Sequence, residues 1–213
     1  MKKNQKRFLY SAGLLIVFVL WTLSVRLVDV RAIGPQGSTV GFAGLNQLVH
    51  DLTGVHFGLY HLTDWLGLVP IFVCFGFAVL GLGQWIKRKW IRKVDTDILA
   101  LGGLYVVTMA AYLLFEYVVT NYRPVLINGI LEASYPSSTT VLTLCVMPTA
   151  IMQLSHRIHN RLLRSLICFA LMAFTAFMVI GRLLSGVHWF TDIVGGVLLS
   201  AGLIFMYASV SGQ

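Results

Sequence analysis

Six long apolar runs alternate with short polar segments along the chain. Each run has the roughly 17–25 mostly apolar residues that a helix needs to cross the hydrocarbon core of a bilayer. The second run contains no charged residue. The pattern therefore predicts an all-α polytopic membrane protein, with six transmembrane helices in one bundle. The expected spans are about 8–25, 65–86, 98–119, 137–155, 165–183 and 190–210.

A shorter apolar pattern lies between the first two runs. Leu45, Leu48, Val49 and Leu52 recur at i, i+3, i+4 and i+7 within residues 44–52, and this spacing is typical of a short amphipathic helix. We expect this helix to lie on the outer membrane interface, in the first outer loop. It either caps an active site or simply connects two spanning helices, and the pattern favours neither interpretation.

The composition also indicates a membrane protein. Hydrophobic residues make up 57% of the 213 residues and charged residues 11%, whereas soluble domains have about 25% charged residues. We expect a single membrane-embedded domain over residues 1–213, with a membrane lipid and no nucleic acid as its partner. The cysteines lie in apolar runs, so they are expected to be buried rather than joined in disulfides. They are Cys74, Cys145 and Cys168.

The net charge of +8 arises mainly from one side of the predicted bundle. Twelve of the sixteen Lys and Arg residues precede the first run or lie in the loops 87–96 and 156–164. Basic loops stay in the cytoplasm, so both termini are expected there, in a bacterial plasma membrane. The loops 26–64, 120–136 and 183–189 then face outward. No small-x-small cleavage site follows the first run, so we expect a retained helix rather than a signal peptide.

Ionisable and hydroxyl residues gather at three of the outward-facing helix ends. Charges in such apolar surroundings are costly and usually mark function. A helix start with free backbone N–H groups, as expected for the second cluster, is also an anion site. The three clusters are Asn121–Pro124 with Arg123, then Tyr135–Thr140 with Ser137, Ser138, Thr139 and Thr140, and then Arg182, His188 and Asp192.

Each cluster also has a simpler interpretation. Arg123 alone is typical of a residue that contacts lipid headgroups, and serines at a helix start are typical caps. Asp192 and Arg182 alone would suggest a buried ion pair, with His188 as filler at a helix interface. These alternatives stay open for each cluster taken alone.

Taken together, the clusters indicate phosphoryl transfer. His188 and Asp192 are four residues apart and would share one helix face. A carboxylate beside a histidine fixes the tautomer of the ring, as a nucleophilic histidine requires. Arg123 and Arg182 would hold the phosphate and stabilise the charge that develops on it.

In this order, the residues resemble the type 2 phosphatidic acid phosphatases, also called lipid phosphate phosphatases. That family has three motifs: Lys-x6-Arg-Pro, Pro-Ser-Gly-His and Ser-Arg-x5-His-x3-Asp. This chain has Arg123-Pro124, Pro136-Ser137 and Arg182-x5-His188-x3-Asp192, and the resemblance covers about residues 60–210. It implies a metal-independent enzyme without a cofactor. His188 would form a phosphohistidine, Asp192 would orient it, and Ser137, Ser138 and the two arginines would bind phosphate.

The chain departs from these motifs at several positions. Glu116 stands where the first motif has lysine, and Thr139 stands where the second motif has the histidine that protonates the leaving group. Glu116 either pairs with an arginine or serves as an acid with a raised pKa. A pyrophosphate substrate would need less acid catalysis, because its leaving group is a weaker base than an alkoxide.

The sequence therefore predicts a membrane phosphatase acting at the outer face on a phosphorylated or pyrophosphorylated lipid. An isoprenoid pyrophosphate, such as undecaprenyl pyrophosphate, is slightly preferred. The alternative is a degenerate member of the family that binds lipid phosphate without turnover.

Overall fold

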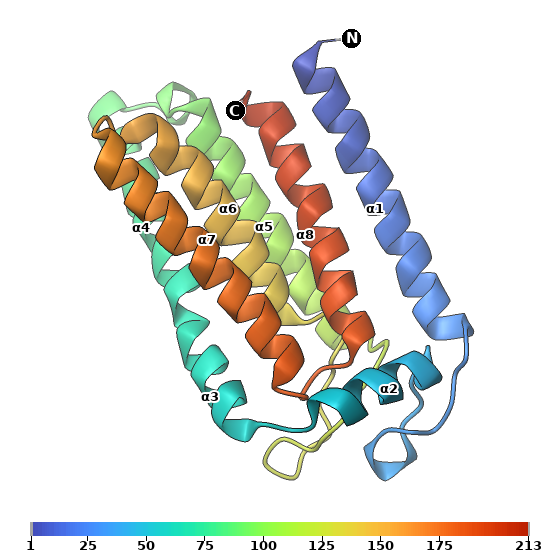
Figure 1. Ribbon diagram of the computed structural model, residues 1–213. Coiled ribbons are helices and arrows are strands. Elements are labelled where there is room, and N and C mark those ends of the chain that lie inside the picture. Colours follow the sequence, from blue (N-terminus) through green and yellow to red (C-terminus); the bar gives the residue numbers. More distant parts are fainter. Residues whose placement is uncertain (1, 213) are drawn as a thin grey trace.

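The structure is a computed structural model that describes residues 2–212, and it is a bundle of helices (Figure 1). Within this range there are no strands, only isolated bridge pairs in loops. Six helical segments are long and apolar enough to span a membrane. The predicted six-helix all-α fold is therefore confirmed. The spans are α1 (Lys3–Leu27), α3 with α4 (Phe57–Leu66 and Leu68–Arg88), α5 (Thr96–Tyr117), α6 (Ser138–Arg157), α7 (Arg161–Leu184) and α8 (Phe190–Ser211).

The second span begins earlier than the sequence predicted. The helix was expected to start near residue 65, but α3 begins at Phe57 and passes into α4 at Gly67. Gly67 keeps a right-handed helical backbone, with φ −59° and ψ −17°. The apolar pattern weakens around His61 and Asp64, which is why the hydrophobicity of the sequence marks only the later part of this helix.

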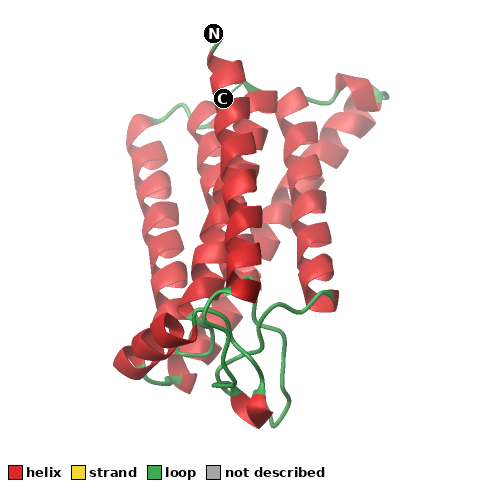
Figure 2. Ribbon diagram, turned by 90° about the vertical axis from the view of Figure 1, so that its right-hand side faces the viewer, coloured by secondary structure: helices red, strands yellow, loops and turns green. Residues whose placement is uncertain are grey.

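The two ends of the bundle differ. Both termini lie at one end, here called the terminal end, with the short 3-10 helix η2 (Ile91–Lys93) (Figures 1 and 2). The opposite end, here called the site end, carries the longer loops, the 3-10 helix η1 (Pro35–Gly37) and α2 (Ala43–Thr53). The predicted amphipathic helix at 44–52 is thus confirmed as α2. Its leucines Leu45, Leu48 and Leu52 are exposed.

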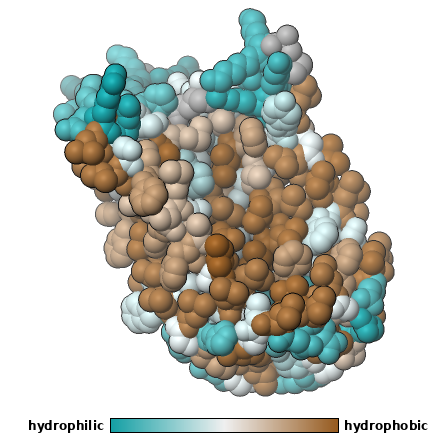
Figure 3. Space-filling view, viewed as in Figure 1, coloured by the Kyte–Doolittle hydropathy of each residue, from teal (hydrophilic) through white to brown (hydrophobic). Residues whose placement is uncertain are grey.

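The helices present apolar side chains to the outside. Phe72, Val106 and Phe169 are 67% to 70% exposed, and Figure 3 shows a hydrophobic middle with hydrophilic residues gathered at both ends. In a bilayer, such a surface contacts lipid chains, so its exposure costs little. This distribution matches the composition of the chain.

The centre of the bundle is formed by α6 and α8. Half of the apolar window in each of these helices is buried, against 6% to 22% in the other four spans. Small residues on α8 allow close packing, as is common between helices in membranes. At Gly202, for example, the backbone carbonyl accepts a hydrogen bond from the Ser11 hydroxyl of α1 at 2.8 Å.

A polar network closes the terminal end. Gln153 of α6 donates to Asp97 at 3.0 Å and to the Tyr207 hydroxyl of α8 at 2.5 Å. Arg157 forms an ion pair with Asp97 at 3.1 Å. This network, here called the terminal clamp, joins α5, α6 and α8 at the end opposite the site.

Candidate active site

His188 lies in the tight turn between α7 and α8, where it is 3% exposed. Gly186 makes this turn possible, because its φ of +67° is in the left-handed region that favours glycine. A side chain there would also collide with the Gly54 carbonyl, since a Cβ would lie 1.9 Å from its oxygen. The turn therefore packs directly on the segment before α3, and His56 N donates to the Ser185 carbonyl at 2.9 Å.

The hydrogen bonds of His188 determine its tautomer. Its Nε2 lies 3.2 Å from Nη1 of Arg123. A guanidinium only donates hydrogen bonds, so Nε2 must be the acceptor and the ring proton must be on Nδ1. Nε2 therefore keeps a lone pair, which accepts the hydrogen bond from Arg123.

Ser134 lies between His188 and Asp192. The distance from His188 Nδ1 to the Asp192 carboxylate is 3.8 Å, which is too long for a hydrogen bond. Nδ1 is instead 3.1 Å from the Ser134 hydroxyl, which donates to Asp192 Oδ2 in a short hydrogen bond. The resemblance implied that Asp192 orients His188, and in the structure the two side chains are connected through Ser134.

Asp192 is completely buried and held by several donors. The Trp189 backbone N–H donates to Oδ2 at 2.9 Å, and the Asn121 side-chain amide donates to Oδ1 at 3.2 Å. These bonds compensate the cost of burying a carboxylate. Asp192 is therefore fixed at the start of α8 before any ligand arrives.

Helix α2 holds the neighbouring residue, Thr191. The Asn46 amide oxygen accepts from Thr191 N at 3.1 Å, and its amide nitrogen donates to the Thr191 hydroxyl at 3.0 Å. His50 of α2 lies against Trp189, with ring centroids 5.5 Å apart. Helix α2 therefore packs on Trp189 and Thr191, which lie between His188 and Asp192, and it is more than a connector.

Two arginines flank His188 on the side of α3. Arg182 is 1% exposed; its guanidinium lies 4.8 Å from the Tyr60 ring centre and donates to the Thr63 hydroxyl at 3.2 Å. Arg123 is 8% exposed and lies 5.9 Å from the same ring. The Arg182 Nε–H is buried, and no hydrogen-bond partner for it exists within residues 2–212. This donor is suited to an anionic oxygen.

The carboxylates that pair with these arginines lie nearer the surface. Arg123 pairs with Glu132 at 3.0 Å, and Arg182 pairs with Asp64 at 3.5 Å. The sequence had left open an ion pair between Arg182 and Asp192. The structure pairs Arg182 with Asp64 instead, since Asp192 is engaged by Ser134.

Burial lowers the pKa of His188 well below its ordinary value of 6.5, and the positive charges of Arg123 and Arg182 lower it further. The imidazole therefore stays neutral at pH 7. A neutral ring with a free lone pair is the form that a nucleophilic histidine needs.

The residues at the start of α6 adjoin this cluster at Ser137. The Ser137 hydroxyl is buried and accepts from Thr140 at 3.0 Å, while its backbone N–H donates to the Asp192 carbonyl. Ser138 and Thr139 line an adjoining pocket. Of the three, only Ser137 is hydrogen-bonded to a residue of the His188 cluster in the structure.

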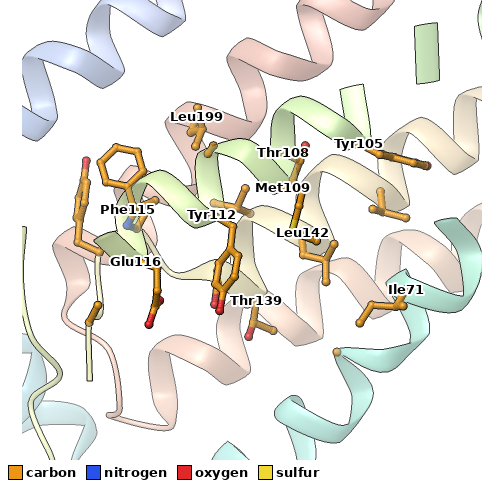
Figure 4. A pocket seen from close by; sticks show the side chains of 18 of the residues that line it. Ile71, Tyr105, Thr108, Met109, Tyr112, Phe115, Glu116, Thr139, Leu142 and Leu199 are labelled. Atoms are coloured by element: carbon orange, nitrogen blue, oxygen red, sulfur yellow. The ribbon is translucent and has the colours of Figure 1, made fainter. Parts of the chain in front are cut away.

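The adjoining pocket, here called the first pocket, has a volume of about 470 Å³ and lies among α4, α5, α6 and α8. Figure 4 shows Phe115 and Glu116 towards one end of it, Ile71 and Tyr105 towards the other, and Thr139 between them. Ser134 and Asp64 also line the first pocket, so it adjoins both the His188 cluster and the partner of Arg182. Within residues 2–212, Glu116 forms none of the observed ion pairs.

Several residues of the cluster were missed in the sequence. Ser134 and Asn46 are loop or interfacial polar residues without a distinctive spacing, and Tyr60 and Asp64 lie on a helix that the apolar pattern did not reveal. Only their contacts in the fold distinguish them. Within the described residues 2–212, no group of three His, Cys, Asp or Glu side chains is placed to hold a metal ion.

Comparison with known proteins assigns the family. The model of the PAP2 superfamily matches residues 97–212, which is more than half of the chain. The chain therefore belongs to the PAP2 superfamily. The matched segment includes all three motifs, with Arg123, His188 and Asp192. None of the curated proteins compared with the chain matches it.

The fold is also similar to a solved structure. A transmembrane PAP2-type phosphatidylglycerolphosphate phosphatase from Bacillus subtilis superposes with a TM-score of 0.63. The alignment covers 93% of this chain and 94% of that one, at 17% sequence identity. At this identity, the similarity concerns the fold, including the helices that precede the matched family segment.

Proposed function

We propose that this chain is a membrane phosphatase that hydrolyses a phosphorylated or pyrophosphorylated lipid through a phosphohistidine on His188. The observation that carries this proposal is the hydrogen-bonded chain from Arg123 through His188 and Ser134 to Asp192. In this chain of hydrogen bonds Nδ1 carries the ring proton. Nε2, which lies between two buried arginines, is therefore the reactive atom. The structural relative, a phosphatidylglycerolphosphate phosphatase, also acts on a lipid phosphate.

The reaction would proceed in two displacements. The Nε2 lone pair attacks the terminal phosphorus and the bond from that phosphorus to the leaving oxygen breaks. The leaving group takes that electron pair: it is the lipid alkoxide from a monophosphate, which must gain a proton, or the lipid monophosphate from a pyrophosphate. Arg123 and Arg182 would neutralise the charge on the phosphoryl oxygens, which is the main route of catalysis in phosphoryl transfer. Water then attacks phosphorus, breaks the phosphorus–nitrogen bond and releases inorganic phosphate and the free imidazole.

The Ser134 hydroxyl would support the first step. When Nε2 bonds to phosphorus, the ring becomes positively charged, and the Nδ1 proton stays directed at Ser134 and, through it, at Asp192. A fixed carboxylate stabilises such an imidazolium. Ser134 is thus assigned a positioning role, as the bridge that transmits the charge of Asp192.

The residues that would face the leaving group suit a pyrophosphorylated lipid better than a lipid monophosphate. Thr139 is too weak an acid to protonate an alkoxide, whereas a lipid monophosphate leaves without a strong acid. Glu116 lines the same pocket and would be the acid if a monoester is cleaved. We therefore favour an isoprenoid pyrophosphate, with the first pocket holding the start of its hydrocarbon chain.

We further propose that the site end faces outward and that both termini are cytoplasmic. Nearly all basic residues outside the site lie at the terminal end, and basic loops remain in the cytoplasm. A tag in the loop 87–96 that is accessible from outside intact cells would contradict this orientation.

The test is phosphate release by the purified protein in detergent, with a lipid pyrophosphate and a lipid monophosphate as parallel substrates. Release should vanish in His188→Ala and persist in His156→Ala, whose exposed histidine lies at the terminal end of α6. Thr139→His should gain activity on the monophosphate. Lipid binding without phosphate release from either substrate would instead favour the degenerate binder.

A further inference from the structure

A second apolar pocket continues from the first pocket towards the terminal end of the bundle. It has a volume of about 320 Å³ and is lined by α4, η2 and α5. Cys74 and Tyr105 line both pockets, so the two pockets lie next to each other at these side chains. Together they follow α4 and α5 from the site end to the region of Trp85 and Ile91.

The two pockets together are longer than one leaflet of a bilayer is thick. From Glu116 to Tyr105, α5 advances eleven residues, or about 16 Å at 1.5 Å per residue. One half of the hydrocarbon core is about 15 Å thick, so the first pocket alone reaches about the midplane. From Glu116 to Ile98 the advance is eighteen residues, or about 27 Å, which is nearly the full core.

The lining shows what kind of group the second pocket accepts. No charged side chain lines it, and the residues specific to it are apolar, including Phe77, Ala78 and Trp85. A phosphate or another charged headgroup would lose its hydration there without compensation. A group that enters this pocket must therefore be hydrocarbon, and Cys74 and Tyr105 are the side chains that it shares with the pocket that adjoins His188.

We infer that the two pockets together form a binding track for one long polyisoprenoid chain, which runs from the phosphate at His188 past Cys74 and Tyr105 into the opposite leaflet. This inference rests on the proposed function and adds a chain-length preference to it. A lipid with chains of one leaflet's length fills only the first pocket. A chain that passes the midplane gains the contacts of the second pocket as well.

The experiment compares two isoprenoid pyrophosphates in the purified protein. One has a chain that fits within one leaflet, and the other has a chain longer than the bilayer core of about 30 Å. Ala78→Trp fills the second pocket from α4, and Val79→Trp is the matched control. Val79 is the next residue, is 50% exposed and lines neither pocket.

The measured quantity is the ratio of kcat/KM for the long substrate to that for the short one. In Ala78→Trp this ratio should fall about tenfold, because the chain can no longer be seated and the phosphate loses its alignment with His188. In Val79→Trp the ratio should match that of the wild type. An equal ratio in all three proteins would overturn the inference and leave the proposed phosphatase intact.

A second readout does not depend on turnover. A long-chain isoprenoid monophosphate with a photoreactive group at the far end of its chain is cross-linked to His188→Ala. Adducts on Phe77 or on the buried Ile98 that disappear in His188→Ala/Ala78→Trp would support the track, even if the protein released no phosphate. Adducts confined to lipid-facing residues such as Val79 would overturn it, and so would adducts confined to the first pocket.

Discussion

The two ends of the bundle both pair arginines with carboxylates, but the burial of the partners differs. In the terminal clamp, the side chains of Arg157 and Asp97 are 30% and 22% exposed, and they meet at 3.1 Å. At the site end, the Arg182 side chain is 2% exposed, while that of Asp64 is 56% exposed at 3.5 Å. An ion pair with a solvated partner is weak. Arg182 is thus a buried cation with a loosely held counter-ion, which a phosphate can replace.

The same difference holds for the other arginine of the site. The side chain of Arg123 is 10% exposed and that of Glu132 is 38% exposed. In the terminal clamp, by contrast, Gln153 donates to Asp97 as well and accepts from Arg157 at 3.0 Å. The clamp is satisfied by its own members, whereas the site retains a buried donor on Arg182 without a partner in the described residues. The first arrangement stabilises the fold, and the second is suited to binding.

The largest expected effect comes from a matched pair of arginine variants. Arg182→Lys should reduce kcat for phosphate release by about 10²–10³-fold, since lysine lacks the planar fork that binds phosphate and loses the Nε donor. Arg157→Lys in the terminal clamp should leave kcat within the error of the assay. Equal losses in the two variants would mean that the two ends do not differ in the way proposed.

Next in size is the loss of the bridge between His188 and Asp192. Ser134→Ala should lower kcat by about tenfold to a hundredfold, as expected for a group that supports an acid–base or nucleophilic residue. KM should change little, because the Ser134 hydroxyl binds Asp192 and His188 rather than phosphate. Ser155→Ala, which removes a hydroxyl at the terminal end of α6, is the control. A rise in KM with unchanged kcat would assign Ser134 to substrate binding instead.

In the terminal clamp the effect should be on stability. Gln153→Ala leaves Asp97 and the Tyr207 hydroxyl without one of their partners, and a lost buried hydrogen bond costs about 1–3 kcal/mol. Thermal unfolding in detergent should therefore shift to lower temperature, while kcat per folded molecule is preserved. A fall in kcat without a change in unfolding temperature would show that the terminal clamp affects catalysis at the site end.

The smallest effect concerns pH. Because burial and two arginines lower the pKa of His188 well below 6.5, the folded protein keeps a neutral imidazole as the pH falls past that value. The profile of kcat/KM, which reports the free enzyme, should show no loss near pH 6.5. The unfolded chain does protonate there, so stability should decline as the pH falls below 6.5 towards the lowered pKa. An activity midpoint near 6.5 would contradict this.

The sequence revealed the fold more completely than the site. Six apolar runs sufficed to predict the spans, because in lipid the backbone must satisfy its own hydrogen bonds and only the helix does so within one segment. His188, Asp192 and the two arginines were recognised because their spacing follows a motif. Ser134 was not, since its role depends on a loop that returns to the start of α8. The pairing of Arg182 with Asp64 depends likewise on α3, which the apolar pattern concealed.

Gly186 has a consequence for how the sequence can vary. Its φ of +67° and the 1.9 Å approach of a Cβ to the Gly54 carbonyl leave no room for any side chain. A library with all twenty residues at position 186 should therefore return glycine alone among active clones. Ser185 and Val187 on either side are fully buried, and Gly186 holds the backbone crossing that brings His188 to its place, so we expect this turn to vary little as a whole.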